Sequence, residues 1–140
     1  MVANASGPLS SLFRIKFDGI VIDAPCSGLG VLSRHPDGKW NKKEEDVQRL
    51  TFVQKSILTE AVSLLKPGGK MLYVTCTISK QENEDIVNGC LSAHKELRLE
   101  NIRDHIPAWG LNLIDARGFL RTFPNEHDMD GFFGALFLKK

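Results

Sequence analysis

The stretch IVIDAPCSGLGVL, residues 20–32, decides the fold because it joins a strand-like run to a turn that carries reactive side chains. The run FDGIVID, residues 17–23, is rich in Ile and Val, which is typical of a strand covered on both faces. Proline and glycine then turn the chain. Neither the strand nor the turn requires the carboxylate of Asp23 or the thiol of Cys26. These two side chains therefore indicate chemistry at the end of the strand.

The residues that follow predict a second strand, reached through a long helix. Apolar side chains recur at helical spacing over residues 47–65, with Asn41 as the helix cap and KPGG, residues 66–69, as the stop. The segment KMLYVTC, residues 70–76, is again typical of a strand. A strand, a crossover helix and a second strand form a right-handed unit in which the two strands run parallel.

The remainder of the chain predicts one more helix and three short strands. Ser79 and Glu82 have the spacing of a capping box, which predicts a helix from this point through about Ala93. Three later segments are typical of short strands separated by loops: LRLENI, GFLRTF and GFFGALFL. The chain is therefore expected to be an α/β protein.

Two cysteines are expected to meet at one edge of this sheet. Cys26 follows the first strand and Cys76 ends the second, and neighbouring strands lie about 4.8 Å apart. Open α/β sheets bind ligands at the carboxyl ends of their strands. Both thiols, together with Asp23, are therefore predicted to share one crevice. Cys90, inside the second helix, is expected to be a buried apolar residue instead.

Composition limits the class of protein. The chain has 140 residues, of which 42% are hydrophobic and 25% charged, and its net charge is +1, as in an ordinary single domain. Its three cysteines form no CxxC pair, which points to a reducing, intracellular compartment. No run of about 18 apolar residues and no signal peptide are present, so no membrane partner is expected.

Other cysteine chemistries fit the spacing poorly. A phosphatase loop places an arginine a short fixed distance after its cysteine, whereas Arg34 lies eight residues after Cys26. Cys26, His35 and Cys76 lack the tight spacing of a zinc site, so no metal is expected. The glycines after Cys26 lack the third glycine of a dinucleotide fingerprint and are expected to form a tight loop.

A local excess of positive charge extends from Arg14 to Lys43, where six cationic residues face three aspartates. Arg34, Lys39 and neighbouring lysines surround Trp40. This segment is either a solvated loop or a nucleic-acid contact in which Trp40 stacks on an unpaired base. The sequence alone leaves both interpretations open.

Three motifs together resemble the catalytic half of the RNA (cytosine-5) methyltransferases. They are DAPCSGLGVLSRHPDGKW, LKPGGKMLYVTCTISKQENE and RTFPNEHDMDGFFGALFLKK, in that order. The family includes the bacterial small-subunit ribosomal RNA enzyme and the nucleolar proliferation antigen, and the resemblance covers residues 17–140. It implies the C-terminal portion of a Rossmann-like fold that uses S-adenosyl-L-methionine, with RNA, ribosomal RNA in particular, as the partner.

The resemblance also implies roles for individual residues. Cys76, in the second motif, would be the nucleophile that adds to carbon 6 of cytosine, and Cys26 would assist release of the methylated product. Asp23 would contact both the cofactor and the cytosine ring, and Pro25 would shape the cofactor-side turn. The substrate-binding residues would be Asp23, Arg34, Lys39 and Trp40.

Members of this family carry a glycine-rich, cofactor-binding loop before these motifs. Residues 1–16 are therefore expected to be the remnant of a preceding strand and a linker, and residues 17–140 the catalytic half. A chain of this kind is expected to bind the cofactor weakly and to cover its open sheet edge with another copy or with the missing N-terminal half. The alternative function is a non-catalytic RNA-binding or assembly module. The expected location is the cytoplasm in bacteria or archaea, and the nucleolus or nucleus in eukaryotes.

Overall fold

A parallel pair of strands forms the centre of the computed structural model, which describes residues 5, 7–34, 40 and 43–140. Strand β1 (Phe17–Asp23) lies parallel to β2 (Leu65–Thr75), with Asp23 opposite Val74 in the register. The two strands therefore end at the same edge of the sheet, as the helix between them predicts.

Three further strands complete the sheet, which has the order β1-β2-β5-β3. Strand β5 (Phe133–Lys139) runs antiparallel to β2, whereas β3 (Leu97–Glu100) and the short β4 (Leu120–Arg121) both pair antiparallel with β5. The three predicted short strands are thus confirmed. They make the sheet mixed rather than wholly parallel.

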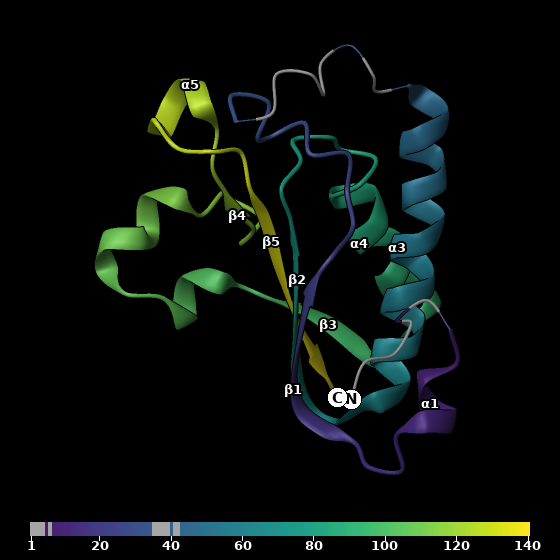
Figure 1. Ribbon diagram of the computed structural model, residues 1–140. Helices are drawn as coiled ribbons and strands as arrows, with labels where there is room; N and C mark the ends of the chain where they lie inside the picture. Colours follow the sequence, from purple (N-terminus) through teal and green to yellow (C-terminus); the bar gives the residue numbers. More distant parts are fainter. Residues whose placement is uncertain (1–4, 6, 35–39, 41–42) are drawn as a thin grey trace.

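Helices cover one face of this sheet (Figure 1). The long α3 (Glu44–Leu64) and α4 (Glu84–Ala93) pack there, and the short α1 (Leu9–Leu12) packs on α3. The other side of the sheet carries the 3₁₀ helices η1 (Ile102–His105) and η2 (Ala108–Leu113) and the short α5 (Pro124–His127). None of the helices in the described part of the chain is both long and apolar enough to span a membrane.

The hydrophobic core lies between the sheet and α3 and α4. Met71 and Tyr73 of β2 stand directly opposite Phe137 and Ala135 of β5, and all four are fully buried. Side chains alternate between the two faces of a strand, so these four lie on the helix-covered face. Cys90 of α4 is buried in the same core, which confirms its predicted packing role.

Strand β1 departs from the prediction that both of its faces are covered. Ile22 is only 7% exposed, but Val21, on the opposite face, is 72% exposed. The reason is coverage, because α3 packs on only one face of β1 and leaves the face that carries Val21 open. The prediction of a doubly covered strand is therefore wrong for the described residues.

The predicted element boundaries also need correction at three places. The second helix begins at Glu84, after Asn83, and Glu82 does not form the predicted capping box with Ser79 because its carboxylate binds elsewhere. Strand β2 begins at Leu65 and includes the KPGG segment, where Gly68 takes a positive φ of 76°. The expected cap Asn41 lies outside the described residues, and so do residues 1–4 and 6 of the expected strand remnant.

Candidate active site

The thiols of Cys26 and Cys76 meet at the carboxyl ends of β1 and β2. Their sulfur atoms are 3.0 Å apart, and the backbone N–H of Cys76 donates a hydrogen bond of 3.3 Å to the Cys26 sulfur. Both side chains are half-buried, and neither forms a disulfide. The predicted convergence of the two thiols is therefore confirmed.

Burial is the main influence on the Cys26 thiol. It raises the pKa of Cys26 to about 12, and the hydrogen bond with Cys76 adds to this effect. A thiolate at Cys26 would lose hydration on burial, and no cation contributes to stabilising its charge. Cys26 is therefore a protonated thiol at neutral pH, and it places an S–H group beside the Cys76 sulfur.

A buried carboxylate holds the loop that carries Cys26. Glu82 is fully buried and accepts hydrogen bonds from the backbone N–H of Ser27 at 2.8 Å and from the Ser27 hydroxyl at 2.5 Å. The side-chain amide of Gln54, from α3, donates to Glu82 at 3.2 Å and to the carbonyl of Pro25 at 2.9 Å. Both residues that flank Cys26 are thus fixed.

The same network fixes both residues that flank Cys76. The Thr77 hydroxyl lies 2.9 Å from the Ser27 hydroxyl, and the Thr75 hydroxyl donates to the side-chain oxygen of Asn83 at 2.6 Å. The Asn83 amide in turn donates to the Thr77 carbonyl at 2.9 Å. The two cysteine loops are therefore joined through side chains of the strand ends and the start of α4.

We call this network the polar clamp; its members are Ser27, Gln54, Thr75, Thr77, Glu82 and Asn83. Every buried polar side chain in the described part of the chain belongs to it except that of Thr122. The sequence carries two signals of this network that do not by themselves reveal its role. The Ser79–Glu82 spacing predicts a capping box instead, and Gln54 interrupts the apolar stripe of the long helix.

Glycines bring a third segment to the same place. The N–H of Gly30 donates to the carbonyl of Cys76 at 3.0 Å, and the N–H of Gly131 donates to the carbonyl of Gly30 at 2.8 Å. A Cβ at Gly30 would lie 1.9 Å from the Gly131 oxygen, so only glycine allows this approach. The tight loop predicted after Cys26 is confirmed. It brings residues 130–133, which we call the DGFF segment, beside the two cysteines.

The other predicted site residues lie around this pair. Asp23 and Pro25 line a hollow of about 420 Å³ along the open side of β1, together with the apolar side chains of Val21 and Ile57. The lining of this hollow differs from the thiol pair, because it consists of one carboxylate and apolar side chains and includes no cysteine. It lies at the same strand ends as Cys26.

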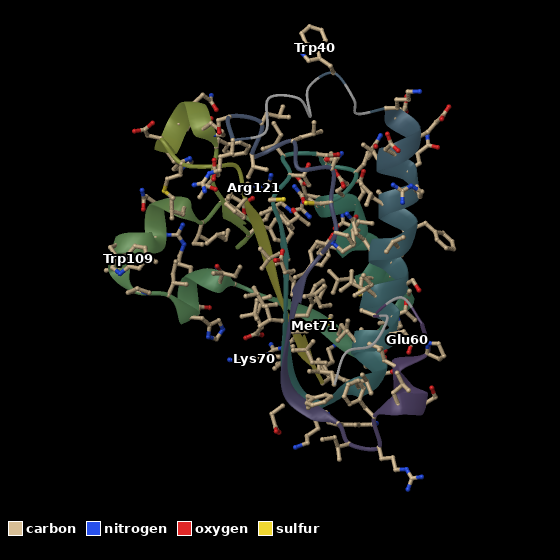
Figure 2. All side chains as sticks on the ribbon, in the orientation of Figure 1. Trp40, Glu60, Lys70, Met71, Trp109 and Arg121 are labelled. Atoms are coloured by element: carbon tan, nitrogen blue, oxygen red, sulfur yellow. The ribbon has the colours of Figure 1, made fainter. Side chains whose placement is uncertain are left out.

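Of the other predicted substrate-binding residues, Arg34 lies near the thiol pair and Trp40 does not. The Arg34 guanidinium forms an ion pair at 2.6 Å with Asp130, the first residue of the DGFF segment. Trp40 is 83% exposed and projects from the end of the molecule, well away from Trp109 (Figure 2). Lys39 and His35 lie outside the described residues. Among the residues that the structure describes, no three potential metal ligands come together.

Comparisons with known proteins give a consistent result. A family model described as 16S rRNA methyltransferase RsmB/F matches residues 2–138. The ribosomal RNA small subunit methyltransferase B of Shewanella oneidensis is 40% identical over 124 residues, which make up 89% of this chain and 27% of that protein. The 28S rRNA (cytosine-C(5))-methyltransferase of Mus musculus is 39% identical over 134 residues, covering 88% of this chain and 17% of that protein. The chain therefore spans less than a third of the length of these relatives.

A solved structure shares the fold. NSun6 from Pyrococcus horikoshii, determined with SFG, matches 99% of this chain and 34% of its own chain, with a TM-score of 0.80 and 29% identity. The mixed sheet described above is thus similar to part of a longer methyltransferase-type chain.

Alkylation with iodoacetamide tests the protonation of Cys26. Because its folded-state pKa is about 12, we expect slow labelling at pH 8 and an increase only at much higher pH. In the urea-unfolded chain the same thiol should become reactive near the ordinary value of about 8.5. Mass spectrometry of the Cys26 peptide measures both rates. Equal labelling of the folded and unfolded chains at pH 9 would contradict the assignment.

Replacing Glu82 tests the polar clamp. Glu82→Ala removes the acceptor of the Ser27 N–H and hydroxyl, and each buried donor left unpaired costs about 1–3 kcal/mol. We expect the free energy of unfolding in urea to fall by about 2–4 kcal/mol. Glu82→Gln, which keeps one acceptor, should lose less.

The neighbouring exposed residue Gln81 provides the matched control. Gln81→Ala should change the free energy of unfolding by less than about 0.5 kcal/mol. If Glu82→Ala were as mild as Gln81→Ala, the carboxylate would not hold the two loops together.

Proposed function

The chain belongs to the 16S rRNA methyltransferase RsmB/F family, and from its site we propose that it carries the thiol chemistry of an RNA cytosine-5 methyltransferase. The observation that carries the proposal is the pair of sulfur atoms 3.0 Å apart, at the ends of two parallel strands. Two thiols at one site suit a reaction that must both add to a base and release it.

Cys76 is the attacking thiol in this proposal. Its sulfur forms a bond to carbon 6 of cytosine, and the electron pair of the C5–C6 double bond makes carbon 5 nucleophilic. After carbon 5 has received a methyl group, its proton passes to a water molecule and the C5–C6 double bond re-forms. The C6–S bond breaks, and its electron pair leaves with Cys76 as a thiolate. Covalent addition divides one difficult step into easier ones.

Cys26 serves the release step. Its burial keeps the thiol protonated, so it can donate a hydrogen bond to the leaving Cys76 sulfur rather than compete as a second nucleophile. The polar clamp holds this thiol by both of its neighbours, Pro25 and Ser27. Because the Cys26 thiol is already held beside the leaving sulfur, it does not have to be oriented during the release step.

Asp23 and Pro25 would hold the cofactor of the family, S-adenosyl-L-methionine, which supplies the methyl group when bound. The hollow that they line fits part of such a molecule, since it combines a carboxylate with apolar walls. Its open side along β1 is continuous with the exposed face of Val21. These residues form one wall only, so we expect this chain to bind the cofactor weakly by itself.

The substrate in this proposal is RNA, and ribosomal RNA in particular, as the names of the relatives suggest. Carbon 6 of a stacked, paired cytosine is out of reach of a side chain, so the base must be unpaired or turned out of its helix. Arg34 and Trp40, both exposed, would contact the RNA strand, and Lys39 of the same segment would join them.

Covalent trapping tests the assignment of the thiols in this chain. Addition to carbon 6 does not need the methyl donor, so RNA containing 5-azacytidine should form a covalent complex that survives a denaturing gel. Cys76→Ala should abolish the complex, whereas Cys90→Ala, changed inside α4, should leave it intact. Persistence of the complex in Cys76→Ala would contradict the proposal.

The role of Cys26 is tested with the same gel. With RNA that carries ordinary cytosine, and with S-adenosyl-L-methionine added at high concentration, Cys26→Ala should retain addition and accumulate more complex than the unaltered chain, because release of the methylated base is slowed. Loss of the complex in Cys26→Ala, in a chain that keeps its folded spectrum, would assign the attack to Cys26 instead.

A further inference from the structure

We propose that the hollow beside the DGFF segment binds nucleotides that flank the target cytosine, with one base stacked on Trp109. This inference rests on the proposed function, because it takes the RNA strand at the cysteine pair as its starting point. It assigns a separate binding surface, formed by η2, the loop before β5 and the segment that follows Cys26.

Two backbone hydrogen bonds link the segment beside this hollow to Cys76. Gly131 donates to the carbonyl of Gly30, and Gly30 donates to the carbonyl of Cys76. On the far side of these glycines, Met129, Asp130 and Phe132 line a hollow of about 730 Å³. In this proposal, an RNA strand whose cytosine lies at Cys76 places its neighbouring nucleotides in this hollow.

Exposed aromatic and apolar side chains form the walls. Trp109 is 78% exposed, and Met129 and Phe132 are also exposed, although large apolar groups ordinarily pack inside a protein. Figure 2 shows Trp109 at the outer end of η2, with its ring projecting from the molecule. Exposed aromatic rings of this kind are the platforms on which proteins stack unpaired bases.

A positioned cation lies at the rim of the same hollow. The Arg34 Nε atom is 2.6 Å from the Asp130 carboxylate, which also accepts a hydrogen bond from the Ser33 hydroxyl at 3.3 Å. The Arg34 side chain is still largely exposed, so its other N–H groups face the solvent. Guanidinium groups bind phosphate through such paired N–H donors. The hollow thus offers a stacking surface and a phosphate contact together.

A single RNA strand fits these features better than double-stranded RNA does. The walls combine aromatic faces with an arginine, and the hollow lies beside the site where one base is held. A double helix keeps its bases stacked on each other, so it cannot place one on Trp109. The occupant is therefore the unpaired stretch on one side of the target base.

Binding of a short single-stranded RNA with one central cytosine tests the inference. Its affinity for the 140-residue chain is measured by fluorescence anisotropy of a labelled strand. Trp109→Ala should weaken the affinity at least fivefold. Phe52→Ala is the matched control, because Phe52 is a 75% exposed aromatic residue of α3 and should change the affinity less than twofold.

A second measurement keeps Trp109 in place. In Trp40→Phe, Trp109 is the only tryptophan of the chain, and stacking on a base should quench its fluorescence as single-stranded RNA is added. Double-stranded RNA of the same sequence should quench it much less. This readout does not depend on the folding of the Trp109→Ala variant.

The outcomes separate this inference from the proposed function. RNA binding that is unchanged in Trp109→Ala and leaves Trp109 fluorescence unchanged would overturn the inference, while a Cys76-dependent covalent complex would keep the proposed function. Trp109-dependent binding without a Cys76-dependent complex would support the inference and overturn the proposed role of Cys76. Absence of any binding to RNA by the folded chain would overturn the inference as well.

Discussion

The hydrogen bonds of the Glu82 carboxylate are the interaction on which the site depends. Ser27 and Gln54, which lie far from it in the sequence, both donate to this one buried group. A buried carboxylate is tolerated only when its oxygens are satisfied, so the loop after β1, the helix α3 and the start of α4 cannot move independently. The separation of Cys26 and Cys76 is a consequence of this constraint. The close packing of Gly30 against Gly131 then adds the loop before β5 to the same rigid unit.

The sheet provides the second level of organisation. The parallel strands β1 and β2 end at the same edge of the sheet. Strand β5 lies antiparallel to β2, so the loop before β5 returns to that edge. The chemistry of the edge is therefore divided among three places: the thiol pair, the hollow with Asp23 along β1, and the hollow with Trp109 beside the DGFF segment. The fold explains why motifs far apart in the sequence lie at one position.

The sequence predicted those features that depend on local pattern and missed those that depend on distant partners. The periodicity of apolar residues correctly predicted the parallel strands and the long helix, and the position of each cysteine at a strand end correctly predicted their approach. The resemblance to the RNA (cytosine-5) methyltransferases is confirmed by the family match. The spacing of Ser79 and Glu82 was misleading because a capping box is a local pattern, whereas the partner of Glu82 is Ser27, on another strand end. The exposure of Val21 was equally hidden, because it depends on which elements surround β1.

Cys26 and Cys76 form one dithiol site in the folded chain, held by the polar clamp. Phenylarsine oxide tests it directly, because its trivalent arsenic binds two neighbouring thiols and releases its oxygen as water. Mass spectrometry of the folded chain should find one arsenical bridging the Cys26 and Cys76 peptides, lost when either residue becomes alanine and unaffected by Cys90→Ala. A folded chain that binds no arsenical, or that binds it without joining these two peptides, would contradict the account.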